Sequence, residues 1–389
     1  MDLPHLAKWA RWKGLDLLGT GDFTHPQWFE ELTAGLVPVG EGIYEHAGVP
    51  FVFTAEVALI WTHEDRTRRV HFLVLAPSAA DAGRINRELG KRCDLEADGR
   101  PTVGMSGADF IALVLTASPK AVVIPAHAWT PWYSIFGSQS GFDSLEEALG
   151  EAARHVFAIE TGLSSDPPMN WRVSSLDRVT LVSFSDAHSP SRLGREACVF
   201  DLPELTFSAL VQAIRDRDPQ RFLFTLEFFP EEGKYHYDGH RACGVVFSPE
   251  QTRKAGRRCP VCGRLVTVGV MYRVERLADR PPGFRPPAAI PCRHLVPLHE
   301  IVAQLLGQGV ETKAVEEEYF RLVHRFGSEM NVLLDVPVQE VGQVSPRLAR
   351  ALAKVRAREV RVQPGFDGQY GRIEIPLDEE VRGPTLFDV

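Results

Sequence analysis

Short apolar runs alternate with amphipathic stretches over the first two thirds of the chain. Runs of this length and composition are typical of buried strands, and the stretches between them have helical spacing. This alternation predicts an α/β fold with a largely parallel sheet. A helix is predicted at 144–155, and strands are predicted at 15–21, 50–59, 70–77, 121–127, 156–162 and 179–186.

The alternation ends near residue 228, and the chain that follows is rich in Gly, Pro, His and Cys. Such a segment cannot build much core of its own. Helical patterning then returns in LHEIVAQLLG, AVEEEYFRLVHRFG and SPRLARALAKVRA. We therefore expect three parts: a catalytic α/β domain at 1–228, a basic metal-binding module at 229–295, and a helical domain with a short tail at 296–389.

The overall composition is that of a folded soluble protein, with 44% apolar and 24% charged residues. No apolar run approaches the ~18 residues that suggest a membrane span. The N-terminal MDLPHLAKWARWKG lacks the layout of an export signal. The six cysteines are too few and too unevenly spread for a disulfide framework. These features together predict a cytoplasmic protein.

Charge is distributed unevenly along the chain. The formal net charge of -8 argues against a protein that coats nucleic acid indiscriminately, because that activity depends on neutralising phosphates. However, residues 241–293 contain eleven cations against three acids, and residues 347–361 contain six cations against one acid. A polarised surface of this kind steers anionic ligands, although solvated helix faces would have the same composition.

Carboxylates and imidazoles recur at the ends of the predicted strands, where ligand sites gather in α/β folds. One such residue is usually a hydrogen-bonded rim residue, but many converging carboxylates would repel one another unless cations lie between them. Mixed imidazole and carboxylate ligands suit Zn, Mn or Fe. The residues in question are Asp22, His25, Glu56, His71, His127, Glu160, Asp186 and His188.

A multinuclear metal centre built from these residues would favour one class of reaction. Bound metals lower the pKa of a water molecule and neutralise charge on an attacked phosphoryl group. Hydrolysis of a phosphoester is therefore the expected chemistry. Hydrolysis of an amide or amine at a similar site is the chemical alternative.

A second metal site is predicted from two short chelating pairs, His240-x-x-Cys243 and Cys259-x-x-Cys262. Their spacing is that of structural zinc sites, in which the metal folds a segment that has little core. Cys292 is the rival to His240 for the fourth ligand position. The neighbouring cations Arg257, Arg258 and Arg264 would then be displayed for contact with phosphates.

The series GDFTHP, AEV, VHFLVLAP, PAHAW, ETGLSSDP and SDAHSP resembles the ordered motifs of the PHP superfamily. The longer stretches KWARWKGLDLLGTGDFTHP and FPEEGKYHYDGHRACG, together with CPVCG, resemble the endonuclease Q family over nearly the whole chain. The resemblance implies a distorted (β/α)7 barrel with a trinuclear cluster of Zn, Mn or Mg. It also implies an endonuclease that cuts DNA on the 5′ side of uracil, hypoxanthine, xanthine or an abasic site. The alternatives are a PHP-type phosphatase of small molecules and a catalytically impaired DNA-binding protein.

The resemblance also implies roles for individual residues. Glu56 would bridge two metals, and His71 and His127 would complete the second metal site. Asp186 would contribute to the first site. The hydroxyls of Ser164 and Ser165 would face a flipped base, since hydroxyls can bond to the edge of a base. The residues around the third metal would be Asp22, His25 and His188.

Two features at the ends of the chain bear on the predicted metal cluster and on the predicted partners. PHP enzymes begin with an H-x-H motif, whereas this sequence begins after it, and the isolated His5 is not a substitute. The simplest expectation is that the natural start lies about 20 residues upstream of Met1; if Met1 is the true start, the first metal site is incomplete. At the other end, Leu386 and Phe387 resemble the apolar anchors of motifs that dock on sliding clamps.

Overall fold

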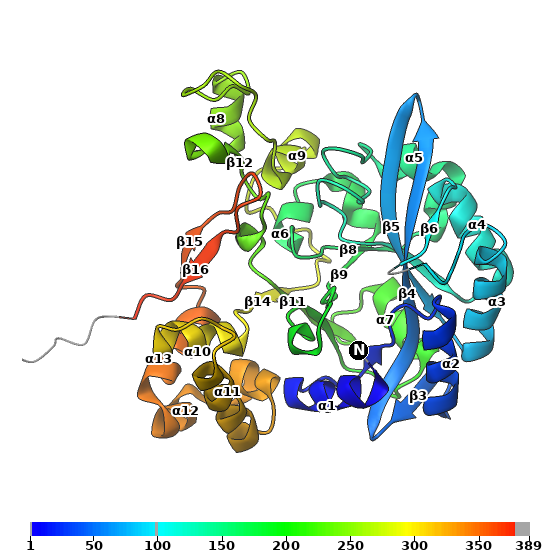
Figure 1. The fold of residues 1–389 in the computed structure, drawn as a ribbon, viewed down its shortest axis with the longest axis horizontal. Coiled ribbons are helices and arrows are strands. Elements are labelled where there is room, and N and C mark those ends of the chain that lie inside the picture. The colour runs from blue at the N-terminus through cyan, green and yellow to red at the C-terminus, as the bar shows by residue number, and fades with distance from the viewer. Residues whose placement is uncertain (1, 98–99, 378–389) are drawn as a thin grey trace, which may run out of the picture.

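The computed structural model describes residues 2–97 and 100–377, which form a mixed α/β fold (Figure 1). The largest sheet has the strand order β2-β3-β4-β5-β7, and β1 and β6 pair with β4 outside this path. The fold class therefore agrees with the α/β prediction. The strands of this sheet are β1 (Leu18–Gly19), β2 (Val37–Gly40), β3 (Ile43–His46), β4 (Val49–His63), β5 (Arg66–Ala76), β6 (Thr102–Val103) and β7 (Val122–Pro125).

The centre of this sheet is a long antiparallel hairpin, so the prediction of a largely parallel sheet is wrong here. Strands β4 and β5 pair from Phe53 opposite Ala76 to His63 opposite Arg66. The chain reverses at Glu64 and Asp65, whose positive φ angles of 47° and 59° suit a tight two-residue hairpin turn. Strand β7 is also antiparallel to β5. No helix separates the two apolar runs at 50–59 and 70–77, which pair directly.

Smaller sheets complete the strand framework. Strands β8 (Ala158–Glu160) and β9 (Thr180–Val182) are parallel to each other. Strand β11 lies between an antiparallel β10 and a parallel β14. The remaining strands are β10 (Ala197–Phe200), β11 (Phe222–Glu227), β14 (Cys292–His294) and two hairpins, β12 (Asp238–His240) with β13 (Val245–Phe247), and β15 (Arg361–Gln363) with β16 (Arg372–Glu374).

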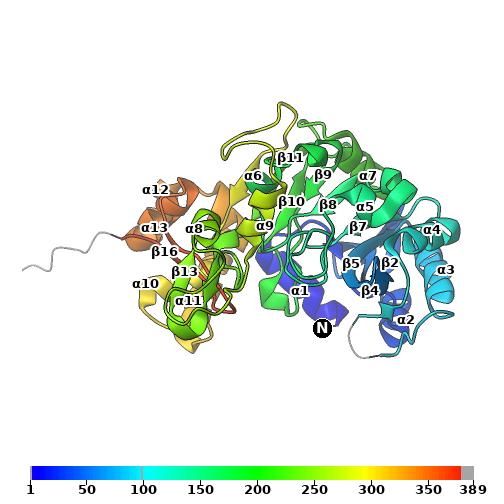
Figure 2. The ribbon, with the colours of Figure 1, turned by 90° about the horizontal axis from the view of Figure 1, so that it is seen from above.

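Helices cover the main sheet and form a separate group at the C-terminal end (Figures 1 and 2). The helix predicted at 144–155 is present as α5 (Leu145–Leu149), which continues as a 3₁₀ helix to His155. None of the described helices combines the length and apolar character needed to cross a bilayer. The others before residue 228 are α1 (Leu3–Lys13), α2 (Pro26–Gly35), α3 (Ala79–Leu89), α4 (Gly107–Ala117), α6 (Pro167–Asn170) and α7 (Phe207–Asp216).

The C-terminal helices have their own apolar core, which includes the buried side chains of Leu298, Leu322 and Leu352. By contrast, buried apolar side chains of the segment between the two helical regions join neighbouring cores, as its second helix and Ile290 show. Val270 and Val274 of that helix join the core of the main sheet. The helices concerned are α8 (Pro249–Lys254), α9 (Val270–Leu277), α10 (Leu298–Leu306), α11 (Lys313–Phe326), α12 (Val338–Val344) and α13 (Pro346–Arg356).

A buried ion pair connects α1 to the C-terminal helices. The Nζ of Lys13 lies 2.5 Å from Oε2 of Glu329, and both side chains are almost fully buried. The Tyr319 hydroxyl donates to the same carboxylate oxygen at 2.8 Å, and the backbone N–H of Leu298 donates to the other at 3.0 Å. Removing one partner of such a pair costs about 3–5 kcal/mol, because it leaves an uncompensated buried charge.

Candidate metal centres

The main sheet places three of the predicted metal ligands on neighbouring strands. Glu56 lies on β4 and His71 on β5, where the register pairs Glu56 with Leu73 and Ala58 with His71. Glu56 and His71 are therefore diagonal neighbours on one face of the sheet. His127 follows β7, the strand on the other side of β5.

These three side chains, the triad, converge on one point. Oε1 of Glu56 lies 2.9 Å from Nδ1 of His71 and 3.1 Å from Nε2 of His127, and the two ring nitrogens are 3.0 Å apart. The three ligand atoms all lie within 4.8 Å of one another, close enough to share one metal ion. The three predicted residues that lie far apart in the sequence thus form one compact site.

An arginine that sequence analysis did not single out supplies a positive charge to the triad. Nη1 of Arg100 lies 2.5 Å from Oε2 of Glu56 and 2.8 Å from Nδ1 of His71. Burial alone would raise the pKa of Glu56, but hydrogen bonds with His127 and His71 hold it well below its usual range. Glu56 is therefore a carboxylate, and its surroundings favour a cation beside it.

A further layer of contacts orients His127. Its backbone N–H donates to Oε2 of Glu160 at 2.6 Å, and its Nδ1 lies 3.0 Å from the hydroxyl of Thr130. Engagement of Nδ1 leaves Nε2 to face Glu56, as in histidines that bind metals. Burial raises the pKa of Glu160 to about 8. The position of Glu160 at a strand end is visible in the sequence, whereas the role of Thr130 is not.

Three predicted site residues have unusual backbone conformations. Asp22, His127 and Asp186 have φ angles of 40°, 32° and 44°, which residues other than glycine rarely adopt. Backbone strain of this kind is concentrated at functional sites. The coincidence of strain with three predicted ligands supports a functional role for this region.

A cavity of about 1430 Å³ connects the remaining predicted ligands with the triad. Arg100 links the two groups, because its Nη2 lies 3.5 Å from Nε2 of His188. The other ring nitrogen of His188, Nδ1, lies 3.0 Å from the backbone oxygen of Asp186. The predicted residues that line the cavity are Asp22, His25, Glu56, Asp186 and His188.

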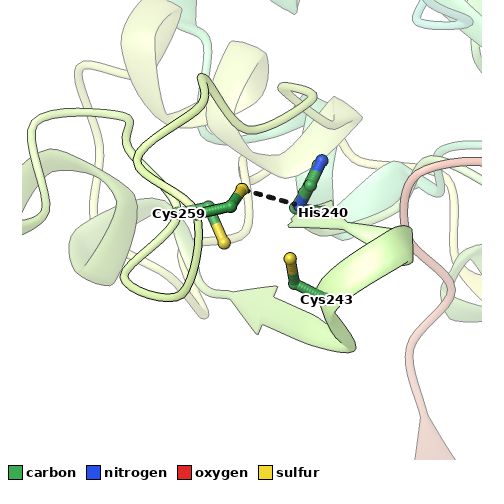
Figure 3. Close-up of side chains that lie close together, drawn as sticks. His240, Cys243 and Cys259 are labelled. Atoms are coloured by element: carbon green, nitrogen blue, oxygen red, sulfur yellow. Dashed lines mark hydrogen bonds between the residues drawn. The ribbon is translucent and has the colours of Figure 1, made fainter.

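The second predicted metal site is also assembled. The ligand atoms of His240, Cys243, Cys259 and Cys262 lie within 4.8 Å of one another, and Figure 3 shows the sulfur atoms and the imidazole facing a common centre. Sγ of Cys262 is 3.6 Å from Nδ1 of His240. We call these four residues the His–Cys₃ cluster; its donors suit tetrahedral zinc.

The turn at Cys259 is shaped for a thiolate. The N–H of Gly263, at φ 72°, donates to the Cys259 carbonyl at 2.8 Å. Burial alone would raise the pKa of the Cys259 thiol, but hydrogen bonds from the backbone N–H groups of Cys262 and Val261 lower it to about 7. Thiolate is the form that binds metals. Cys292 lies on β14 opposite Thr225, and burial raises its pKa to about 12. His240, and not Cys292, belongs to the group of four side chains that lie close together.

The residues predicted to contact DNA have mixed outcomes. Ser165 is only 1% exposed, and its hydroxyl donates to the Thr161 carbonyl at 2.9 Å and accepts from Asn170. Its prediction as a base-facing residue is therefore wrong for this conformation, because the hydroxyl is used inside the loop. Ser164 is half-buried. The arginines Arg257, Arg258 and Arg264 are exposed beside the His–Cys₃ cluster, whereas Leu386 and Phe387 lie outside the described residues.

Comparison with known proteins places these features in a family. The chain is 32% identical to a lesion-specific endonuclease Q from Pyrococcus furiosus, with a TM-score of 0.87 and coverage of 100% of this chain and 94% of that structure. The chain belongs to the endonuclease Q family. The predicted family and the predicted class of enzyme, an endonuclease, are confirmed by this match.

Other similar proteins match this chain over different shares of its length and of their own. A structure of endonuclease Q with a 27-mer duplex carrying an abasic lesion matches with a TM-score of 0.85, 32% identity, and coverage of 97% of this chain and 92% of that one. The protein YqxK of Bacillus subtilis is 27% identical over 375 residues, 93% of this chain and 89% of its own length. The protein MJ0043 of Methanocaldococcus jannaschii is 32% identical over 257 residues, 64% of this chain and only 31% of its own length. Residues 297–359 match the family model of the MJ0043 C-terminal domain.

Proposed function

We propose that this protein is a metal-dependent endonuclease that hydrolyses DNA on the 5′ side of deaminated bases (uracil, hypoxanthine or xanthine) and of abasic sites. The observation that carries this proposal is the triad of Glu56, His71 and His127, whose Glu56 lines the cavity. Membership of the endonuclease Q family supports it, as does the abasic duplex bound to a family member. The substrate would place its action in the cytoplasm, on the chromosome.

The triad fits a divalent metal. Nδ1 of His71 and Nε2 of His127 face each other at 3.0 Å, and such a pair of ring nitrogens calls for a shared proton or a cation. One carboxylate and two imidazoles suit Zn or Mn, while Mg would depend more on the surrounding carboxylates. When bound, the metals would supply a water of low pKa and neutralise charge on the phosphodiester. The residues proposed to complete the cluster are Asp22, His25, Asp186 and His188.

The protein's own groups would hold and orient this centre. Glu56 remains ionised and offers its two oxygens in different directions, one to the histidines and one to Arg100. Once a metal balances the Glu56 charge, the Arg100 guanidinium would be available for a phosphate oxygen, for which its fork geometry is suited. Glu160 and Thr130 would keep His127 in the orientation that binds the metal.

The other parts of the chain would bind the DNA. In this proposal residues 1–228 form a distorted (β/α)7 barrel of PHP type, residues 229–295 a module with a structural zinc at the His–Cys₃ cluster, and residues 296–389 a helical domain. The exposed arginines of the module would contact phosphates, which position a duplex but do not read its sequence. The half-buried Ser164 would lie near the lesion. The arginines are Arg257, Arg258 and Arg264.

A nicking assay tests the proposal. The protein is incubated with Mn, Mg or Zn and a duplex that contains one deoxyuridine, deoxyinosine or abasic site, with an undamaged duplex of the same sequence as the control. A single nick on the 5′ side of the lesion is expected. Absence of nicking with all three metals would contradict the proposal, and turnover of a phosphate monoester without DNA cleavage would instead indicate a phosphatase.

A further inference from the structure

The loop between β7 and α5 connects the triad to an exposed tryptophan. Trp132 lies in this loop, and 40% of its surface is exposed. Its ring packs edge-to-face against Tyr235, with centroids 5.2 Å apart and an interplanar angle of 73°. A large aromatic side chain that is held on one side and exposed on the other is suited to contact a flat ligand.

Residues before and after Trp132 in the chain contact histidines of the triad. The next residue, Tyr133, accepts a hydrogen bond at its carbonyl from the backbone N–H of His71 at 3.0 Å, and its ring lies 4.7 Å from the His71 ring. On the other side, the Thr130 hydroxyl contacts Nδ1 of His127 and donates to the Trp132 carbonyl at 3.0 Å. The position of Trp132 is therefore fixed relative to two histidines of the triad.

The rest of the loop is held rigidly. A Cβ at Gly137 would lie 2.3 Å from the Thr130 carbonyl oxygen, so the loop closes on itself too tightly for a larger residue. Arg273 of α9, which is 5% exposed, donates to the carbonyls of Phe136 at 2.8 Å and Phe142 at 2.5 Å. Because these contacts fix the loop before any ligand binds, little conformational entropy is lost when Trp132 makes a contact.

Positive charge lies close to this aromatic surface. The Nζ of Lys234, the residue before Tyr235, lies 4.4 Å from the ring centre of Tyr370. The guanidinium of Arg69 lies 5.9 Å from the ring centre of Tyr133. Exposed aromatic rings next to cations form the usual surface for unpaired nucleotides, in which bases stack on the rings and cations face the backbone.

We infer that Trp132 stacks on a nucleobase beside the lesion and holds the scissile phosphodiester at the triad. This inference rests on the proposed function. The stacked base is the neighbour of the lesion rather than the lesion itself, because the proposed substrates include abasic sites, which have no base. Stacking suits such an enzyme since every base has a π-face, so that the contact is independent of sequence.

Binding and fluorescence measurements test this role. Trp132→Ala and Trp132→Phe are compared with the unchanged protein on an abasic duplex that carries 2-aminopurine next to the lesion, without added divalent metal. The Ala variant is expected to bind roughly 10- to 100-fold more weakly, the range for loss of one stacked base. The Phe variant retains most of the affinity. The 2-aminopurine signal is expected to be quenched by the unchanged protein and the Phe variant but not by the Ala variant.

Controls separate this inference from the proposed function. Val37→Ala removes an exposed apolar side chain from the edge strand β2 and is expected to leave binding unchanged. If the unchanged protein binds and nicks the duplex and Trp132→Ala matches it in affinity and fluorescence, the stacking role is overturned while the proposed function stands. If the unchanged protein neither binds nor nicks lesion DNA with added metal, both are overturned. Metal content and circular dichroism establish that each variant is folded.

Discussion

The triad and the His–Cys₃ cluster bring predicted metal ligands together by opposite means. The triad takes Glu56 and His71 from two strands of one sheet and His127 from the segment directly after a third, so its position depends on the register of those strands. The four members of the His–Cys₃ cluster lie between residues 240 and 262, on one short strand, the 3₁₀ helix that follows it, and the turn that begins at Cys259. The first site is built by tertiary structure and the second by local chain geometry.

This difference predicts which site depends on its metal for structure. The sheet around the triad is anchored by large buried side chains such as Phe51, Phe53 and Phe72, so it has a core without any ion. Beside the cluster, the apolar side chains of Val261 and Leu265 are exposed and add nothing to a core. A metal at the triad would therefore serve chemistry, whereas a metal at the cluster would serve folding.

The largest effect is expected at the triad. Glu56→Gln keeps the shape of the side chain but removes the charge that the two histidines and Arg100 share. We expect nicking of lesion DNA to fall roughly 100- to 1000-fold, the size typical for loss of one group that stabilises a transition state. The melting temperature should change little, because the surrounding core is intact. Glu64→Gln, at the exposed tip of the β4–β5 hairpin, is the control. Equal activity of the two variants would contradict a catalytic role for the triad.

An intermediate effect is expected at the His–Cys₃ cluster. Cys259→Ser should lose about one zinc per chain in elemental analysis, since a four-ligand site loses one donor. Cys292→Ser is the matched control, because Cys292 lies on β14 outside the cluster, and it should retain this zinc. DNA affinity should weaken in Cys259→Ser more than the nicking rate at saturating DNA does. Loss of zinc in the Cys292 variant alone would contradict the assignment of His240 as the fourth ligand.

The smallest effect is expected on the pH dependence of stability, through a buried histidine in the segment between the triad and the His–Cys₃ cluster. His236 is 5% exposed, and its carbonyl accepts from Met271 of α9 at 3.0 Å. Burial lowers the pKa of His236 to about 4, although the charge of Asp166 opposes this shift. The unfolded chain therefore binds more protons than the folded one between pH 6.5 and 4. The stability that neutral His236 contributes is complete above pH 6.5 and is lost as the pH falls towards 4.

Thermal unfolding between pH 7 and pH 5 measures the part of this contribution that is lost above pH 5, at most about 2 kcal/mol. His236→Gln cannot titrate, so its melting temperature should fall less on acidification than that of the unchanged protein. His155→Gln, a change at an exposed histidine, is the control. Equal acid sensitivity of the unchanged protein and His236→Gln would show that the buried imidazole does not govern this pH range.

Local features were the more predictable ones from sequence. The spacing of His240, Cys243, Cys259 and Cys262 predicted their cluster because all four lie within a short stretch. The apolar runs also predicted the positions of the main strands. The β4–β5 hairpin was missed because its turn, Glu64–Asp65, adopts positive φ without the Gly or Asn that usually indicates such a turn.

Features that depend on packing were not predictable in the same way. Arg100 contacts Glu56 and His71 only because the chain brings residues from distant positions to one end of the sheet. Ser165 carries a hydroxyl in a suggestive loop, but tight folding of that loop uses the hydroxyl internally. The same limit applies to α9, whose Val270 and Val274 pack against the main core although the neighbouring sequence is that of a small metal-binding module.

The ion pair of Lys13 and Glu329 determines how this protein can be recombined with its relatives. A chimera that took its C-terminal helices from a homologue without an acid at position 329 would leave the Lys13 ammonium isolated in an apolar interior. A chimera that took its first helix from a homologue with an apolar residue at position 13 would leave the buried Glu329 carboxylate without its partner. The first helix and the last helices of a chimera must therefore come from the same parent, although they lie near opposite ends of the chain.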